Sequence, residues 1–185
     1  MGSAARGYLE MTMSVSLGLL ILRVVVGLTL AGHGAQKVFG WWDGPGMAGW
    51  IQAVTRLRIR PAAPWAWIAA LSELGGGLLL ALGLLSPLGS LAIAGSMLVA
   101  IATVHWANGF WTTKRGYEFN LTLLAAVAAI ALMGPGAYSL DQAIGIRLPE
   151  PLTLIGGTIA VIVGTVATLA SRSPKVEAQP KPQTT

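Results

Sequence analysis

The chain of 185 residues contains no cysteine and few charged residues, and both absences narrow what it can be. Without cysteine it cannot form disulfides, hold an iron–sulfur cluster, attach haem covalently, or use a thiolate in catalysis. Charged residues make up 10% of the sequence, whereas soluble domains contain about 25%. A soluble protein of this size could not bury the 54% of residues that are hydrophobic. The composition therefore indicates a single integral membrane domain.

The sequence also lacks a dense run of basic residues, although its net charge is +5. Lysines and arginines are scattered through the predicted loops and termini, where membrane proteins usually carry positive charge. The charge therefore does not indicate a nucleic-acid partner, and the lipid bilayer is the partner that the composition predicts. The first apolar run is too long for a secretory signal and has no clear cleavage site, so we expect it to stay in the membrane.

Most of the chain consists of long apolar stretches separated by turns rich in glycine and proline. A helix crosses a bilayer with about 20 apolar residues, so the pattern predicts an all-α, membrane-spanning helical bundle. Four helices form the expected core, and a fifth transmembrane helix follows it. The predicted spans are residues 15–38, 65–85, 88–107 and 117–133 in the core, and residues 152–170 for the fifth helix.

A shorter segment between the first two spans is amphipathic. Arg56 and Arg60 fall on one side of a helix, and the other side carries Met47, Trp50, Ile51, Val54 and Leu57. This spacing predicts a helix that lies in the membrane interface; a helix folded back on the bundle is the alternative. The chain thus divides into an N-terminal segment, a four-helix core, a linker with the fifth helix, and a disordered tail, at residues 1–13, 14–141, 142–170 and 171–185.

The loops differ in charge between the two sides of the predicted bundle. Five crossings place nine lysines and arginines on one side and two on the other. Because positive loops stay in the cytoplasm, the N-terminus is expected outside and the C-terminus in the cytoplasm. Without the fifth crossing the count becomes six against five, and the orientation is not determined. Tryptophans gather on the basic side, as an aromatic belt or, for one or two of them, as the wall of a flat ligand's pocket.

Ionisable residues lie inside the apolar stretches, where a charge costs about 2.5–3.5 kcal/mol on insertion scales. Such residues usually face the interior of a bundle and mark a function or an ion pair. These residues are Arg23, His33, Lys37, Glu73, His105 and Glu118. At a rise of about 1.5 Å per residue, all of them except Arg23 are expected in the same half of the bilayer. We therefore predict a shared polar site near the tryptophan-rich side.

The pairing of these groups is open at the level of sequence. Glu73 is the natural counter-ion of Arg23 or Lys37, and Glu118 is that of Lys37 or His105. Pairs that only hold helices together are the alternative to a ligand site. Two histidines on different helices also suit axial haem ligation. No third ligand stands at a metal-binding spacing, so no metal site is predicted.

Several motifs stand in an order that resembles a known family. The sequence contains Arg23-x-x-x-Gly27, Gly32-His33-Gly34-Ala35-Gln36-Lys37, Glu73-x-x-Gly76-Gly77, Gly109-Phe110, and a run from Gly134-Pro135-Gly136 to Asp141. Between residues 19 and 141 this pattern resembles the DoxX family of small bacterial and archaeal inner-membrane proteins. The resemblance implies a four-helix core in the cell membrane. It also implies that the family's polar positions fall on Arg23, His33, Lys37, Glu73, Glu118 and Asp141.

The resemblance also implies a link to redox chemistry. Some relatives are described as subunits of thiosulfate:quinone oxidoreductase or terminal quinol oxidase complexes, and others as membrane partners that tether soluble redox enzymes. Asp141 has a structural interpretation as well, because it or Ser139 would cap a short helix after the turn at residues 134–136.

We therefore expect a membrane subunit of a redox system that binds quinone or tethers a soluble oxidoreductase. Any catalysis would occur in a complex with a soluble or membrane redox protein, and sulfur oxidation would take place on that partner. A quinone head group needs apolar or aromatic faces, hydrogen-bond donors at its two carbonyls and a proton route. The expected ligand contacts are His33, Lys37, Glu73, His105, Trp106 and Glu118, and the expected structural polar pairs involve Arg23, Glu73 and Asp141.

Two alternatives remain from the sequence. The first is a non-enzymatic scaffold or assembly protein that recruits enzymes through residues 56–60 and the basic tail. The second is a small proton-coupled transporter that uses Glu73. The chain shows no inverted repeat or paired broken helices of the kind that many carriers have, which favours the redox and scaffold hypotheses.

Overall fold

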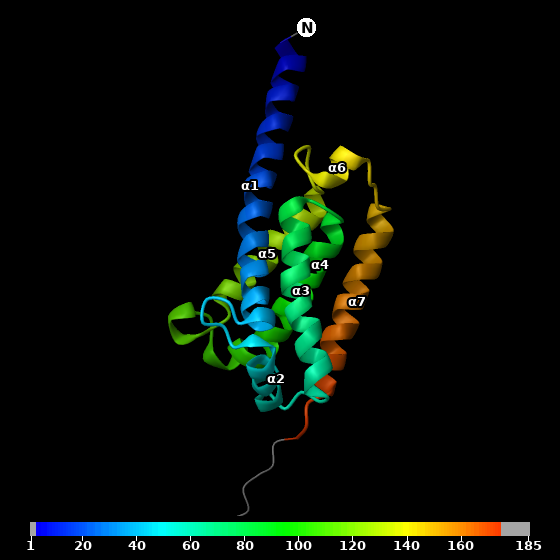
Figure 1. Cartoon of the computed structure of the whole chain (residues 1–185). Helices are drawn as coiled ribbons and strands as arrows, with labels where there is room; N and C mark the ends of the chain where they lie inside the picture. Colours follow the sequence, from blue (N-terminus) through cyan, green and yellow to red (C-terminus); the bar gives the residue numbers. More distant parts are fainter. Residues whose placement is uncertain (1–2, 175–185) are drawn as a thin grey trace, which may run out of the picture.

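A computed structural model describes residues 3–174, and their secondary structure is helical apart from one isolated bridge. The α-helices are α1 (Ser3–Phe39), α2 (Gly46–Arg56), α3 (Ala62–Leu82), α4 (Ser86–Ala100), α5 (Glu118–Met133), α6 (Leu140–Ile144) and α7 (Glu150–Ala170). The long helices run alongside one another as a bundle, with α2 and α6 at its two ends (Figure 1). The predicted all-α bundle is confirmed.

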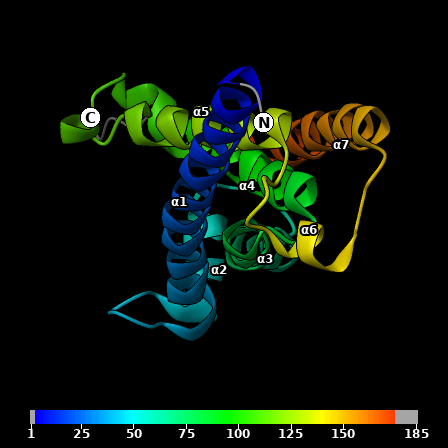
Figure 2. The ribbon, with the colours of Figure 1, turned by 90° about the horizontal axis from the view of Figure 1, so that it is seen from above.

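Four helical stretches are long and apolar enough to cross a membrane: residues 11–39, 62–82, 86–108 and 150–170. They coincide with four of the five predicted spans, including the last. The third stretch extends beyond α4 through a π-helical turn, Ile101–His105, and a 3-10 turn, Trp106–Asn108. The remaining predicted span, α5, is apolar but has 16 residues, a rise of roughly 24 Å. It slants across the other helices (Figures 1 and 2).

Helices α1 and α3 pack against each other most closely, because glycines remove side chains from their interface. A Cβ atom built on Gly27 would lie 2.6 Å from the carbonyl oxygen of Gly77, and one on Gly77 would lie 2.5 Å from the nitrogen of Ala31. The two backbones are therefore nearly in contact. Beyond this contact α1 continues toward its N-terminus and projects past the bundle (Figure 1). From Ser3 onward, the predicted N-terminal segment is thus the first part of α1.

The apolar core lies between α1, α3, α4 and α5. Its buried residues are Val26, Leu30, Leu80, Ile93, Met97, Leu123, Val127 and Ile130. Helix α7 packs on the outside of this core against α4 and buries only Thr168. Most of its apolar side chains are exposed, as expected for a helix that borders lipid.

The predicted amphipathic helix forms as α2, and its apolar face packs against the protein. Val54 of α2 joins Ile59 and Ala66 in a small buried cluster, and the indole Nε1 of Trp50 donates a hydrogen bond to the carbonyl oxygen of Ala66 at 3.0 Å. The bundle thus occupies the face that the interfacial prediction assigned to lipid. The helix adopts the alternative placement, folded against α3.

The C-terminal end of α7 is joined to the loop between α2 and α3. Arg60 donates its backbone N–H to Ser171, and Ser173 donates to Arg58. Helix α7 therefore runs the length of the bundle and ends beside α2. We call this end of the bundle the basic end. It comprises the C-terminal end of α1, the whole of α2, the start of α3, the 105–116 loop and the end of α7. The tail predicted to be disordered starts at residue 171, and residues 171 and 173 take part in these bonds. From residue 175 onward the tail lies outside the described residues.

Candidate functional site

An ion pair between α1 and α3 forms the centre of the site. The Nζ atom of Lys37 contacts Oε2 of Glu73, and the Glu73 side chain is only 4% exposed while that of Lys37 is 18% exposed. Ser96 of α4 donates its hydroxyl to Oε1 of Glu73 at 2.6 Å. The Lys37 ammonium also lies 4.5 Å from the ring centroid of Trp50, a cation–π distance. A buried carboxylate persists in its charged form only with such partners.

A cavity of about 610 Å³ opens beside this ion pair at the basic end. Helices α1 to α5 and the 105–116 loop all contribute to its lining. Its polar lining residues are His33, Lys37, Glu73, His105, Asn108, Thr112, Arg115 and Asn120, and its aromatic ones are Trp50 and Phe119. We call this space the polar cavity. It brings together four of the six residues that the sequence predicted as ligand contacts.

The two histidines enter the polar cavity from different elements. His33, on α1, lies near Phe119 of α5 with ring centroids 6.3 Å apart. His105 ends the π-helical turn after α4, and its Nδ1 is 2.7 Å from the carbonyl oxygen of Arg115. Because a carbonyl only accepts hydrogen bonds, Nδ1 carries the hydrogen. In the neutral ring Nε2 is then left as an acceptor.

The other two predicted contacts, Trp106 and Glu118, do not line this cavity. Trp106 is 66% exposed and stacks on Tyr117, with ring centroids 5.3 Å apart. Glu118 accepts a hydrogen bond from the backbone N–H of Thr112 at 2.9 Å. Both side chains therefore hold the 105–116 loop in place. The expected pairing of Glu118 with Lys37 or His105 is replaced by this loop contact.

The structure also separates Arg23 from Glu73. Arg23 lies 14 positions before Lys37 on α1, roughly 21 Å along the helix. Its side chain is fully buried and Nη2 donates to the carbonyl oxygen of Tyr138 at 2.6 Å. Glu73 is therefore the counter-ion of Lys37, and the alternative pairing with Arg23 does not form.

Asp141 acts at this opposite end of the bundle, where it caps α4. Its two carboxylate oxygens accept hydrogen bonds from the backbone N–H groups of Leu85 and Ser86, at 2.8 and 3.1 Å. Ser139 caps the short helix α6 instead, because its hydroxyl accepts from the N–H of Gln142. Both residues are caps as expected, but Asp141 stabilises a helix that lies 55 positions away in the sequence.

Sequence reasoning did not predict several residues of the site. Ser96 bonds Glu73, and the cavity is also lined by Trp50, Asn108, Thr112, Arg115, Phe119 and Asn120. Trp50 was expected to contribute to an aromatic surface layer. Ser96 and Asn120 are neutral polar residues inside apolar helices, and such residues usually hydrogen-bond to a neighbouring helix. That signal identifies them as interior residues, but it does not show which cavity they face.

The family comparison agrees with the architecture. The model of the DoxX family matches residues 18–106, a range that includes His33, Lys37, Glu73, Ser96 and His105. No curated protein and no solved structure matches the chain. Residues 18–106 of this membrane bundle thus match the DoxX family model, in agreement with the resemblance seen in the sequence motifs.

Proposed function

We propose that the protein is a membrane subunit of a redox system, and that the polar cavity binds the head group of a quinone. The observation that carries the proposal is the placement of the buried Lys37–Glu73 pair at the wall of a cavity that two histidines also line. The volume of about 610 Å³ falls within the usual size of small-molecule sites. Trp50 and Phe119 supply aromatic walls for a flat ring.

The side chains of the cavity suit the proton chemistry of such a ligand. Reduction of a quinone to a quinol takes two electrons and two protons. Lys37 and His33 offer hydrogen-bond donors for the carbonyl oxygens. Glu73, buried and reached from the cavity, is placed to pass protons, as intramembrane carboxylates do in relays. His105 bonds the carbonyl oxygen of Arg115 and so connects the cavity to the 105–116 loop at the basic end.

We propose that the electrons come from another protein, since this chain has no cysteine for an iron–sulfur cluster or covalently attached haem. We propose that a soluble oxidoreductase docks at the basic end. Arg56, Arg60, Lys114 and Arg115 are exposed there, and the bonds to residues 171–173 fix the loop that carries Arg60. An acidic surface on the partner would complement these charges.

Quinone binding is tested with the purified protein and a chain-free benzoquinone, with titration calorimetry as the readout. We expect Glu73→Gln and the double variant His33→Ala/His105→Ala each to weaken binding by about tenfold or more, or about 1.4 kcal/mol. Glu150→Gln is the matched control, because its exposed carboxylate stands at the start of α7, at the opposite end of the bundle, and does not line the cavity. If the wild type binds no quinone, or if Glu150→Gln weakens binding as much as Glu73→Gln does, the proposal is wrong.

The docking proposal is tested by co-purification from native membranes, followed by absorbance of flavin or haem in the eluate. We expect Arg56→Glu/Arg60→Glu to lose the coloured partner. Arg147→Glu, an exposed arginine of the α6–α7 connection at the other end, should keep it. Equal recovery with both variants would show that the basic end is not the docking site.

A further inference from the structure

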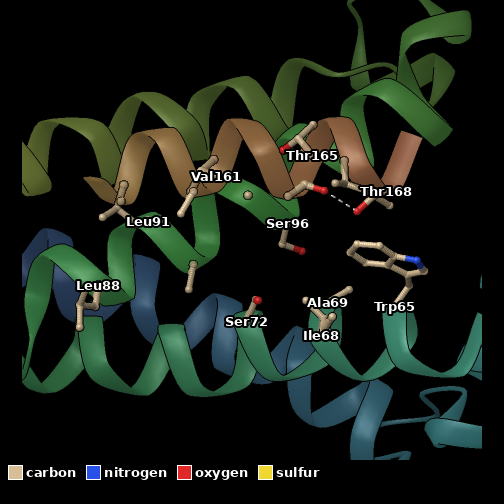
Figure 3. Close-up of a pocket in the computed structure, with 16 residues that line it drawn as sticks. Trp65, Ile68, Ala69, Ser72, Leu88, Leu91, Ser96, Val161, Thr165 and Thr168 are labelled. Atoms are coloured by element: carbon tan, nitrogen blue, oxygen red, sulfur yellow. Dashed lines mark hydrogen bonds between the residues drawn. The ribbon is translucent and has the colours of Figure 1, made fainter. Parts of the chain in front are cut away.

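A second cavity lies on the side of the bundle, between α3, α4 and α7. Its volume is about 350 Å³. Trp65 and Ile68 of α3, Leu88 and Leu91 of α4, and Val161 of α7 line it, and in Figure 3 these side chains border a channel between the three helices. All three helices belong to membrane-spanning stretches. We call this space the lateral groove.

The lateral groove exists because α7 approaches α4 closely at only part of its length. A Cβ atom on Gly157 would lie 2.2 Å from a Leu91 methyl carbon, whereas one on Gly164, two turns further along, would meet nothing within 4 Å. From Gly157 to Thr168 the groove follows α7 for roughly 16 Å. Its lining is almost wholly apolar. A groove of this kind between membrane-spanning helices fits a hydrocarbon chain better than a polar solute.

The lateral groove is connected to the polar cavity. A small space of about 70 Å³ shares Trp65, Ser96 and Thr168 with the groove, and it shares Lys37 and Glu73 with the polar cavity. Ser96 stands at the junction: its hydroxyl bonds Glu73, and in Figure 3 it points into the groove opposite Ser72. The apolar groove therefore leads to the buried carboxylate from the side that faces lipid.

We propose that the lateral groove holds the isoprenoid chain of the quinone whose head group lies at Glu73, an inference that rests on the function proposed above. Three features support this occupant: the groove is apolar, it lies among membrane-spanning helices, and the small space beside it shares lining residues with both the groove and the polar cavity. The ligand enters from the bilayer between α3 and α7. Helix α7 is the least buried of the four membrane-spanning stretches, with 6% of its most apolar window buried, so the least packing has to be disturbed there.

Two glycines of α7 provide the test. Gly164→Phe places a ring in the lateral groove, where a Cβ meets no atom. Gly156→Phe is the matched control, because a Cβ there also meets no atom and the residue does not line the groove. Both variants gain the same helix propensity. Each protein is placed in nanodiscs of one phospholipid, and its affinity is measured for a chain-free benzoquinone and for the same head group with a ten-carbon or isoprenoid chain.

We expect the chain to tighten binding to the wild type and to Gly156→Phe by about tenfold or more. Gly164→Phe should lose this gain and keep the affinity for the chain-free compound. If the chain brings no gain, or if Gly164→Phe keeps it, the inference is wrong while binding of the chain-free compound still supports the proposed function. If neither compound binds, both fail. Loss of a tightly bound phospholipid from Gly164→Phe in native mass spectrometry, with quinone affinity unchanged, would assign the groove to a lipid and overturn the inference.

Discussion

The buried ion pair between Lys37 and Glu73 makes a quantitative prediction about stability. Lys37→Met keeps the length and the apolar stem of the side chain but removes the ammonium from Glu73. The carboxylate, only 4% exposed, then retains Ser96 as its hydrogen-bond donor. Removing one partner of a fully buried pair costs about 3–5 kcal/mol. Because Lys37 is 18% exposed and water partly screens the pair, we expect a cost of about 2–4 kcal/mol.

A double-mutant cycle separates the charge from the packing. Lys37→Met/Glu73→Leu removes both charges and leaves apolar groups of similar volume, which is often neutral for a buried pair. We expect its stability to lie within about 1 kcal/mol of the wild type. The cost of the single variant Glu73→Leu, measured alongside, completes the cycle and gives the coupling energy. The measurement is reversible unfolding in mixed micelles with increasing denaturing detergent. Lys114→Met, at an exposed lysine of the 105–116 loop, is the control and should change stability by less than about 0.5 kcal/mol.

A cost below about 1 kcal/mol for Lys37→Met would contradict this reasoning. It would mean that Glu73 is protonated in the folded protein and that its contact with Lys37 is an ordinary hydrogen bond. The double variant would then be no more stable than Lys37→Met. Quinone binding by the double variant adds a second criterion. If the double variant recovers stability but not quinone binding, the pair has a role in binding beyond holding the helices together.

Three further predictions use the same unfolding measurement. Gly77→Ala should cost about 1–3 kcal/mol or more because the new methyl group meets backbone atoms of α1 at 2.5 Å. In the control Gly75→Ala the methyl group meets no atom, and stability should rise by up to about 1 kcal/mol. Equal effects of the two substitutions would refute the close α1–α3 contact. Asp141→Ala should cost about 1–2 kcal/mol because α4 loses its cap, and a neutral result would contradict capping. Trp50→Phe should cost about 1 kcal/mol for the lost bond to Ala66, and a cost below about 0.3 kcal/mol would show that this bond is not needed.

Much of the fold could be predicted from the sequence because the length of an apolar run determines whether a helix can cross a bilayer. The apolar run at residues 152–170 predicts a fifth span on this basis, and the helix at residues 150–170 is one of the four stretches long and apolar enough to cross a membrane. The placement of α2 could not be predicted in the same way. An amphipathic face is satisfied equally by lipid or by a neighbouring helix, and only the tertiary contacts of Val54 with Ile59 and Ala66 decide between them.

The site could be predicted in part, for a related reason. Helix rise fixes depth, so His33, Lys37 and Glu73 could be placed at one level from sequence alone. Which cation pairs with Glu73 depends on how α1 and α3 are aligned, and the glycine contacts between these helices set that alignment. Trp106 and Glu118 were misplaced because they stand at the two ends of the irregular segment between α4 and α5, where helix periodicity does not apply. Trp106 is oriented by stacking on Tyr117, and Glu118, the first residue of α5, by its bond to Thr112.

The two polar clusters of the bundle differ in what their charged atoms face, and this difference is the physical basis for assigning function to one of them. At the opposite end, Arg23 and Asp141 bond to backbone groups of Tyr138, Leu85 and Ser86, so they close a turn and a helix terminus. Neither residue lines the polar cavity or the lateral groove, although Nε and Nη1 of Arg23 are buried without a hydrogen-bond partner among the described residues. At the basic end, the pair is reached from the polar cavity on one side and from the lateral groove, through Ser96, on the other. A charge that is paired and yet borders open space can exchange partners. In the proposed function, exchange of the Lys37 contact for a ligand oxygen would let the Glu73 carboxylate take up a proton and deliver it to the quinone oxygen, while the partner protein supplies the electrons.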